Sequence, residues 1–182
     1  MLGFHYASLF VVGTWLPFLV FHYQRHEVIT PLHVLVTLFN SINLLICLWE
    51  LSLYFHQNHI QQTFAKLKKR YRSDVPYAEA LFSEVSLSKA LTLKHWGIIW
   101  AVYSFLDPSY SDEVTFGFWI DTGNGISMLV PSILMTVGLT WDIASARALG
   151  VLCMLANYQM MYGTIVYFAG YFHNLRYKGS KT

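Results

Sequence analysis

The sequence predicts an all-α, multi-pass membrane protein: a bundle of four transmembrane helices with an additional amphipathic or re-entrant helical segment. Of its 182 residues, 55% are hydrophobic and only 12% are charged, whereas soluble domains carry about 25% charged residues. The apolar residues form unbroken runs that are long enough, as helices, to cross a bilayer core of about 30 Å. A membrane β-barrel would instead need many alternating segments of about ten residues.

The most informative run covers about residues 30–55. Thr30 supplies an N-cap hydroxyl and Pro31 needs no N–H in the first turn, so a helix begins here. A carboxylate in hydrocarbon costs several kcal/mol, so Glu50 should face protein or a water-filled cavity. At about 100° per residue, five side chains of this run fall within about 100° of arc and make one stripe: His33, Asn40, Asn43, Cys47 and Glu50.

Three more apolar runs complete the bundle, which we expect to be a single transmembrane domain over residues 1–182. The first span covers about residues 4–21, the third about 114–139 and the last about 143–172. The third span carries a second polar stripe that includes Asp121 and Asn124. In the last span, small residues recur at intervals of seven and predict a seam for a neighbouring helix: Ala156, Gly163 and Gly170.

Residues 57–72 form a helix of different character. Ile60, Phe64, Leu67 and Tyr71 fall on one face. The helix therefore either lies in the membrane interface, attracted by anionic lipid headgroups, or is a solvated basic helix. Its remaining faces carry five cations: Lys66, Lys68, Lys69, Arg70 and Arg72.

Residues 78–106 are predicted as an interfacial or re-entrant helix. The apolar core, residues 95–106, is about twelve residues long and therefore short of a full span. If it does not cross, ten cations share one side of the membrane, with only Arg25 and Arg147 on the other; if it crosses, the split is eight to four. The positive-inside rule favours the first arrangement, with both termini and loop 57–113 in the cytoplasm. The ten are Lys66, Lys68, Lys69, Arg70, Arg72, Lys89, Lys94, Arg176, Lys178 and Lys181.

Glu50 and Asp121 are the candidate catalytic residues, because both acids fall inside predicted spans. A carboxyl group shielded from water can exchange a proton near neutral pH. The alternative is that the acids only hydrogen-bond across helices and so hold the bundle together. The candidate ligand-binding residues lie on these two polar stripes and on one face of the last span: His33, Asn40, Asn43, Asn124, Asn157, Thr164 and Tyr167.

The histidines suggest a metal site, but their positions argue against one. His22 and His26 are one turn apart, as are His56 and His59. The two pairs lie at opposite ends of the second span, about 30 Å apart, so they cannot share a metal ion. We expect no metal and no cofactor, since the chain has no phosphate-binding loop, dinucleotide fingerprint or nucleophile elbow. The net charge of +2 does not favour a nucleic-acid partner.

Residues 161–168, MYGTIVYF, and residues 100–108, WAVYSFLDP, resemble segments of the emopamil-binding family, the sterol isomerases and the wider EXPERA domain. Residues 161–168, MYGTIVYF, resemble its Tyr-Gly-Asp-x-x-Tyr-Phe segment, with Thr164 in place of Asp. Residues 100–108, WAVYSFLDP, are similar to the stretch before the acid-bearing helix of sigma-receptor members, where Asp121 takes the place of a Glu. The resemblance implies a bundle with a cavity for a sterol-like ligand. A fainter likeness, from Asn43 to Glu50, is to integral-membrane terpene cyclases, which protonate an isoprenoid.

The sequence leaves two functions open. In the first, the cavity binds an apolar, sterol- or isoprenoid-like lipid; as an enzyme it would be a cofactor-independent isomerase or cyclase in which Glu50 protonates a double bond. In the second, the chain is a non-catalytic accessory subunit of a larger membrane complex, and the small-residue seam contacts a partner. A homodimer is compatible with either. We expect the endoplasmic reticulum membrane in a eukaryote and the inner membrane in a bacterium.

Overall fold

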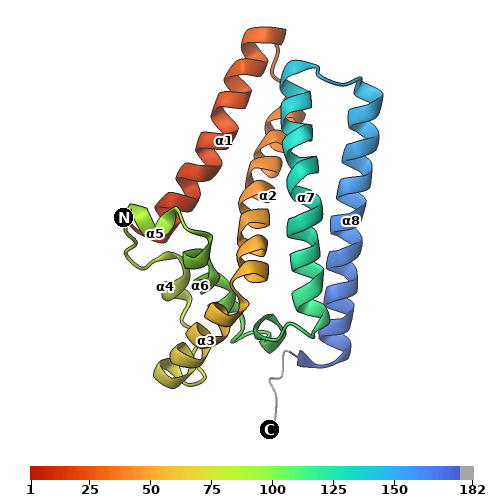
Figure 1. Cartoon of the computed structure of the whole chain (residues 1–182). Helices are drawn as coiled ribbons and strands as arrows, with labels where there is room; N and C mark the ends of the chain where they lie inside the picture. The colour runs from red at the N-terminus through yellow and green to blue at the C-terminus, as the bar shows by residue number, and fades with distance from the viewer. Residues whose placement is uncertain (177–182) are drawn as a thin grey trace.

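The computed structural model describes residues 1–176 and shows an all-α bundle over that range (Figure 1). The tail cations Lys178 and Lys181 lie outside the described residues. Four helices are long and apolar enough to cross a membrane, which confirms the predicted fold class. They are α1 (Gly3–His26), α2 (Pro31–Phe55), α7 (Phe116–Trp141) and α8 (Ala146–His173).

Shorter helices gather at one end of the bundle, near both the start of α1 and the end of α8 (Figure 1). The single helix predicted over residues 78–106 is three helices in the structure. Ser86 and Thr92 adopt extended backbone angles and precede new helices, as Ser and Thr favour caps over helix interiors. The elements are α3 (Gln57–Tyr71), α4 (Tyr77–Leu81), α5 (Leu87–Ala90), α6 (Leu93–Tyr103) and the 3-10 helix η1 (Pro108–Ser111).

The apolar helix α6 packs against the end of α2 and does not run the length of the bundle. Its 11 residues span about 16 Å at 1.5 Å per residue, roughly half of a bilayer core. Trp100 Nε1 donates a hydrogen bond to the Trp49 carbonyl at 2.6 Å, and Ser52 Oγ donates to the Leu93 carbonyl at 2.6 Å. This placement fits the arrangement in which residues 95–106 do not cross; the side of the membrane stays a prediction from charge.

The apolar face predicted on α3 packs against protein. Ile60 and Leu67 are buried in the core that α3 shares with α6. The ring of Phe64 meets that of Phe105 edge-on, with 5.2 Å between centroids. This face is therefore covered by protein, and contact of the cations of α3 with lipid headgroups stays a prediction.

Helices α2 and α7 lie close together at Gly125. A Cβ atom at Gly125 would lie 2.6 Å from the Cβ of Glu50 and 3.2 Å from the Cys47 carbonyl oxygen. Only glycine allows the two backbones to come this near. The polar stripe predicted on α2 lies in this interface, because Asn40, Asn43, Cys47 and Glu50 are all buried.

Helix α8 packs on α7 and leaves most of its surface exposed. Ala156 is buried, and a Cβ atom on Gly163 would be in van der Waals contact with Ile120 of α7. Gly170 has open space beside it. The first two residues of the predicted seam therefore serve a contact within the chain.

We predict that Gly125→Ala will lower the free energy of unfolding by about 1–3 kcal/mol, because the added methyl group overpacks the α2–α7 contact. Gly123→Ala is the matched control, since a Cβ at Gly123 meets nothing within 4 Å and alanine favours a helix. Unfolding in detergent micelles, followed by circular dichroism, measures both. Equal stability of the two variants would contradict the close approach.

Candidate functional site

Glu50 of α2 and Asn124 of α7 form a hydrogen-bonded pair across the interface between these two helices. The Glu50 carboxylate is 4% exposed. Both of its oxygens accept hydrogen bonds from Asn124 Nδ2, at 3.0 and 2.8 Å. The structure thus brings together two residues that the sequence assigned to one site, one as an acid and one as a ligand contact.

Asn43 makes a second polar link between the same helices. Its Nδ2 donates to Ser132 Oγ at 2.8 Å and approaches Cys47 Sγ at 3.8 Å. The Asn43 side chain was predicted to contact a ligand, but its amide donor already forms a hydrogen bond within the protein. Asn43 and Glu50 both hold α2 against α7.

Asp121 lies in a different environment from Glu50. The hydroxyl of Tyr110, in η1, hydrogen-bonds to its carboxylate. Burial, followed by the nearby charge of Asp121, raises the pKa of the Tyr110 phenol above its ordinary value. Because Glu50 bonds to Asn124 while Asp121 bonds to Tyr110, the two candidate catalytic acids belong to separate networks.

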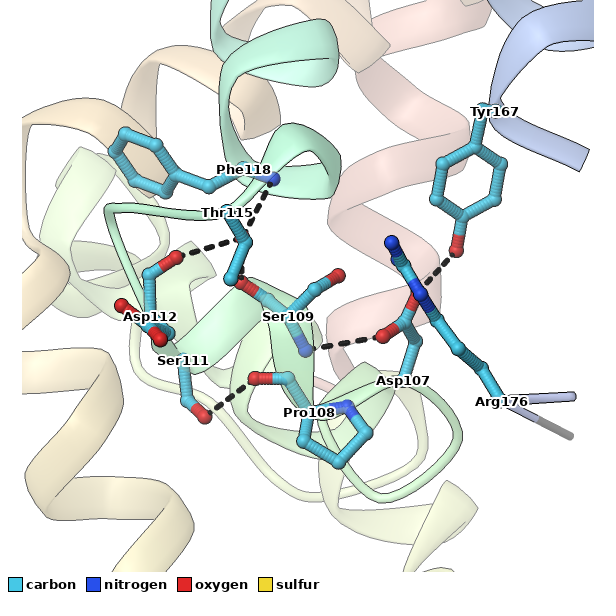
Figure 2. A network of polar contacts seen from close by, with 9 residues as sticks. All are labelled: Asp107, Pro108, Ser109, Ser111, Asp112, Thr115, Phe118, Tyr167 and Arg176. Atoms are coloured by element: carbon cyan, nitrogen blue, oxygen red, sulfur yellow. Dashed lines mark hydrogen bonds and ion pairs between the residues drawn. The ribbon is translucent and has the colours of Figure 1, made fainter. Parts of the chain in front are cut away.

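Asp107 is the centre of a network that the sequence did not predict (Figure 2). Its carboxylate is 1% exposed. One oxygen accepts from the Ser109 backbone N–H at 3.0 Å; the other accepts from the Tyr167 hydroxyl at 2.7 Å and from Arg176 Nη1 at 3.2 Å. Tyr167, predicted as a ligand contact, is thus committed to this network.

The surroundings of Asp107 favour its ionised form. Burial alone would raise the pKa of this carboxyl group, but hydrogen bonds from Ser109 and Tyr167 and the charge of Arg176 outweigh burial and hold the pKa below its ordinary value. The carboxylate therefore ties the turn before α7 to the end of α8. The Asp-Pro sequence indicated a turn, but no local pattern pointed to Tyr167 or Arg176.

Three histidines meet at the opposite end of the bundle. His22 and His26 of α1 lie beside His33 of α2, with ring centroids 3.6 Å apart for His22–His33 and 4.4 Å for His22–His26. His22 Nδ1 lies 2.8 Å from the Leu139 carbonyl oxygen. The sequence predicted only the pair on α1. Within residues 1–176, no group of three or more His, Cys, Asp or Glu side chains is arranged to hold a metal ion.

A groove lies between α2 and α8, with α7 as its floor. We define it by two adjoining cavities of about 460 and 280 Å³ that share Val36 and Cys153. Its lining is largely apolar, with a few polar groups. The remaining residues are Thr30, Leu32, His33, Met135, Gly138, Leu139, Asp142, Ala144, Ala146, Leu149 and Gly150 in the larger cavity, and Leu35, Phe39, Asn40 and Asn157 in the smaller.

Two residues that line this groove each carry a buried hydrogen-bonding atom that has no partner among residues 1–176. The atoms are Nδ2 of Asn40, a residue that is 2% exposed, and Nε2 of His33. A buried donor left unpaired costs about 1–3 kcal/mol. The amide of Asn157 donates to the Cys153 carbonyl of its own helix at 2.8 Å. Thr164 is exposed and does not line the groove.

Comparison with protein-family models, curated proteins and solved structures found no match to this chain. The resemblance to the emopamil-binding family therefore stays a prediction. The two segments that carry it meet in the fold, through the hydrogen bond between Asp107 and Tyr167.

We predict that Asn124→Leu will cost about 2–4 kcal/mol of stability, because it leaves the buried Glu50 carboxyl group without its donors. Glu50→Gln should cost less, since the amide oxygen can still accept from Asn124. The double change Glu50→Leu with Asn124→Leu should recover part of the loss. Chemical unfolding in micelles measures all three; a fully stable Asn124→Leu protein would show that the pair does not hold the helices.

We predict that Asp107→Asn will lower stability by about 1–3 kcal/mol at neutral pH. The Asp107 pKa is lowered in the fold, so its stabilisation is complete above the ordinary value of about 3.9 and is lost as pH falls through the folded value. The wild type should therefore lose stability in acid more steeply than the variant. Thermal unfolding between pH 3 and 7 tests this, with the exposed Asp74→Asn as control; parallel pH profiles would contradict it.

Proposed function

We propose that this membrane protein binds a lipid-like molecule in the groove between α2 and α8. The observation that carries the proposal is the groove itself, a largely apolar hollow with a few polar side chains on its walls, Asn40 among them. The larger cavity, about 460 Å³, is within the 300–1,000 Å³ range that is common for small-molecule sites. Hydrocarbon would lie against Leu35, Val36 and Phe39, with a polar group at Asn40.

The geometry favours binding over acid–base catalysis. A general acid must reach the atom that it protonates, but neither Glu50 nor Asp121 lines the groove. Both Glu50 oxygens are also taken by Asn124. We therefore propose that Glu50 acts by holding α2 to α7, the wall and floor of the groove. A sterol- or isoprenoid-like ligand would agree with the family resemblance.

The exposed surface of α8 supports the second candidate, an accessory subunit of a larger complex, less well. Ala156 and Gly163, which a partner helix would be expected to use, already pack on α7. The exposed remainder of α8 is largely apolar, as expected for contact with lipid, and also carries Asn157, Gln159 and Thr164. A binding protein that is stable alone fits these observations better.

We predict that Gly150→Leu will reduce bound lipid at least severalfold, because Gly150 lines the larger cavity and a side chain there has open space to fill. Gly13→Leu, on the exposed face of α1, is the matched control. Native mass spectrometry of gently extracted protein, with lipid analysis of the same sample, measures occupancy. Retained lipid in both Gly150→Leu and Val36→Phe, or stoichiometric partner proteins on an empty bundle, would overturn the proposal.

A further inference from the structure

His22 of α1 joins two sides of the larger cavity of the groove. Its ring stacks on that of His33, on the α2 wall, with 3.6 Å between the ring centroids and 24° between the ring planes. Its Nδ1 atom lies 2.8 Å from the carbonyl oxygen of Leu139, on the α7 floor. Because a carbonyl oxygen only accepts, Nδ1 carries the proton in this contact. His33 and Leu139 both line the cavity, so one imidazole ring connects its wall to its floor.

The stacked pair suits two rings of which at most one is charged. Histidine is the side chain that ordinarily gains a charge between pH 5 and 8. Two positive charges on rings whose centroids are 3.6 Å apart repel each other strongly, and water screens them incompletely because both side chains are partly buried. Acid conditions therefore oppose the contact that connects the wall to the floor.

The charged groups around the pair leave it without a counter-ion. Asp142 lines the same cavity, but its carboxylate pairs with Arg25 Nε at 3.4 Å and with His26 Nε2 at 3.5 Å. The His26 ring lies 4.4 Å from that of His22, centroid to centroid, so a charge on His26, which Asp142 favours, adds to the repulsion. Two other charged side chains at this end are exposed and form no ion pair within residues 1–176: Glu27 and Arg147.

We propose that His22 and His33 form an acid-sensitive gate of the lipid groove. While the rings are neutral, the stack is closed and holds the wall and the floor of the larger cavity together around a lipid. When both rings take up a proton, the stack opens, and the His33 ring moves into the cavity beside it and displaces the lipid. This inference depends on the proposed function, because it describes the regulation of the same groove.

Two probes test the gate: cholesterol, a sterol, and geranylgeraniol, an isoprenoid alcohol. Each is titrated into delipidated protein in micelles at pH 7.5 and at pH 5.5, on either side of the ordinary histidine pKa of about 6.5, and native mass spectrometry gives the affinities. We expect a probe that binds at pH 7.5 to bind at least tenfold more weakly at pH 5.5. Equal affinities at the two pH values would overturn the gate but leave the proposed function in place; no binding of either probe at either pH would overturn both.

Two substitutions remove the charge and keep the contacts. His33→Phe retains a ring that can stack on His22 but cannot take up a proton, so probe binding should be equal at the two pH values. In His22→Asn the amide can still donate to the Leu139 carbonyl without titrating, and the same result is expected. His173→Phe, exposed at the far end of α8, is the control and should keep the full pH dependence. A pH dependence that survives both His22→Asn and His33→Phe would overturn the inference.

The stability of the lipid-free protein gives a readout that does not depend on either probe. The repulsion between charged rings exists only while they are stacked, so the stabilisation by the pair is complete at neutral pH and is lost as the pH falls. Thermal unfolding should therefore show a larger loss of stability from pH 7.5 to pH 5.5 in the wild type than in His33→Phe. Equal losses in the two proteins would show that the stack is not acid-sensitive and would overturn the gate.

Discussion

The arrangement of this protein depends on the close approach of α2 and α7. Gly125 removes the side chain that would keep the helices apart, and the Glu50–Asn124 pair then closes between them. The other elements pack around this pair: α6 covers the end of α2, and α8 packs on α7. The groove exists because α8 is held by α7 and stands away from α2.

Much of the fold could be predicted because its signals are local. Length, apolar runs and the Thr30-Pro31 start define four spans, and a 3.6-residue period places Asn40, Asn43 and Glu50 on one buried face. The partners of those residues could not be predicted in the same way. Asp121 and Asn124 lie one turn apart on α7, yet one reaches Tyr110 and the other Glu50. The rotation of α7 about its axis, relative to α2, determines which of these two side chains meets Glu50. Helical periodicity in the sequence does not reveal that rotation.

The groove and the Asp107 network could not be predicted from local sequence patterns for the same reason. A groove forms where two helices do not touch, and the absence of a contact leaves no pattern in the sequence. Asp107 draws its partners from Tyr167 and Arg176, which lie 60 and 69 residues further along the chain. Thr164 was selected by its spacing from Asn157, but the groove ends before that turn of α8.

The separation of Glu50 and Asn124 by 74 residues has a consequence for biosynthesis. At about 5–20 residues per second, α2 enters the membrane roughly 4–15 s before α7 has been made. During that interval the carboxyl group of Glu50 has no native donor, so α2 must stay at the insertion machinery or beside water until α7 arrives. The short helices α3 to α6 are synthesised during this interval. The contact between Glu50 and Asn124 therefore forms only after the third span has been made.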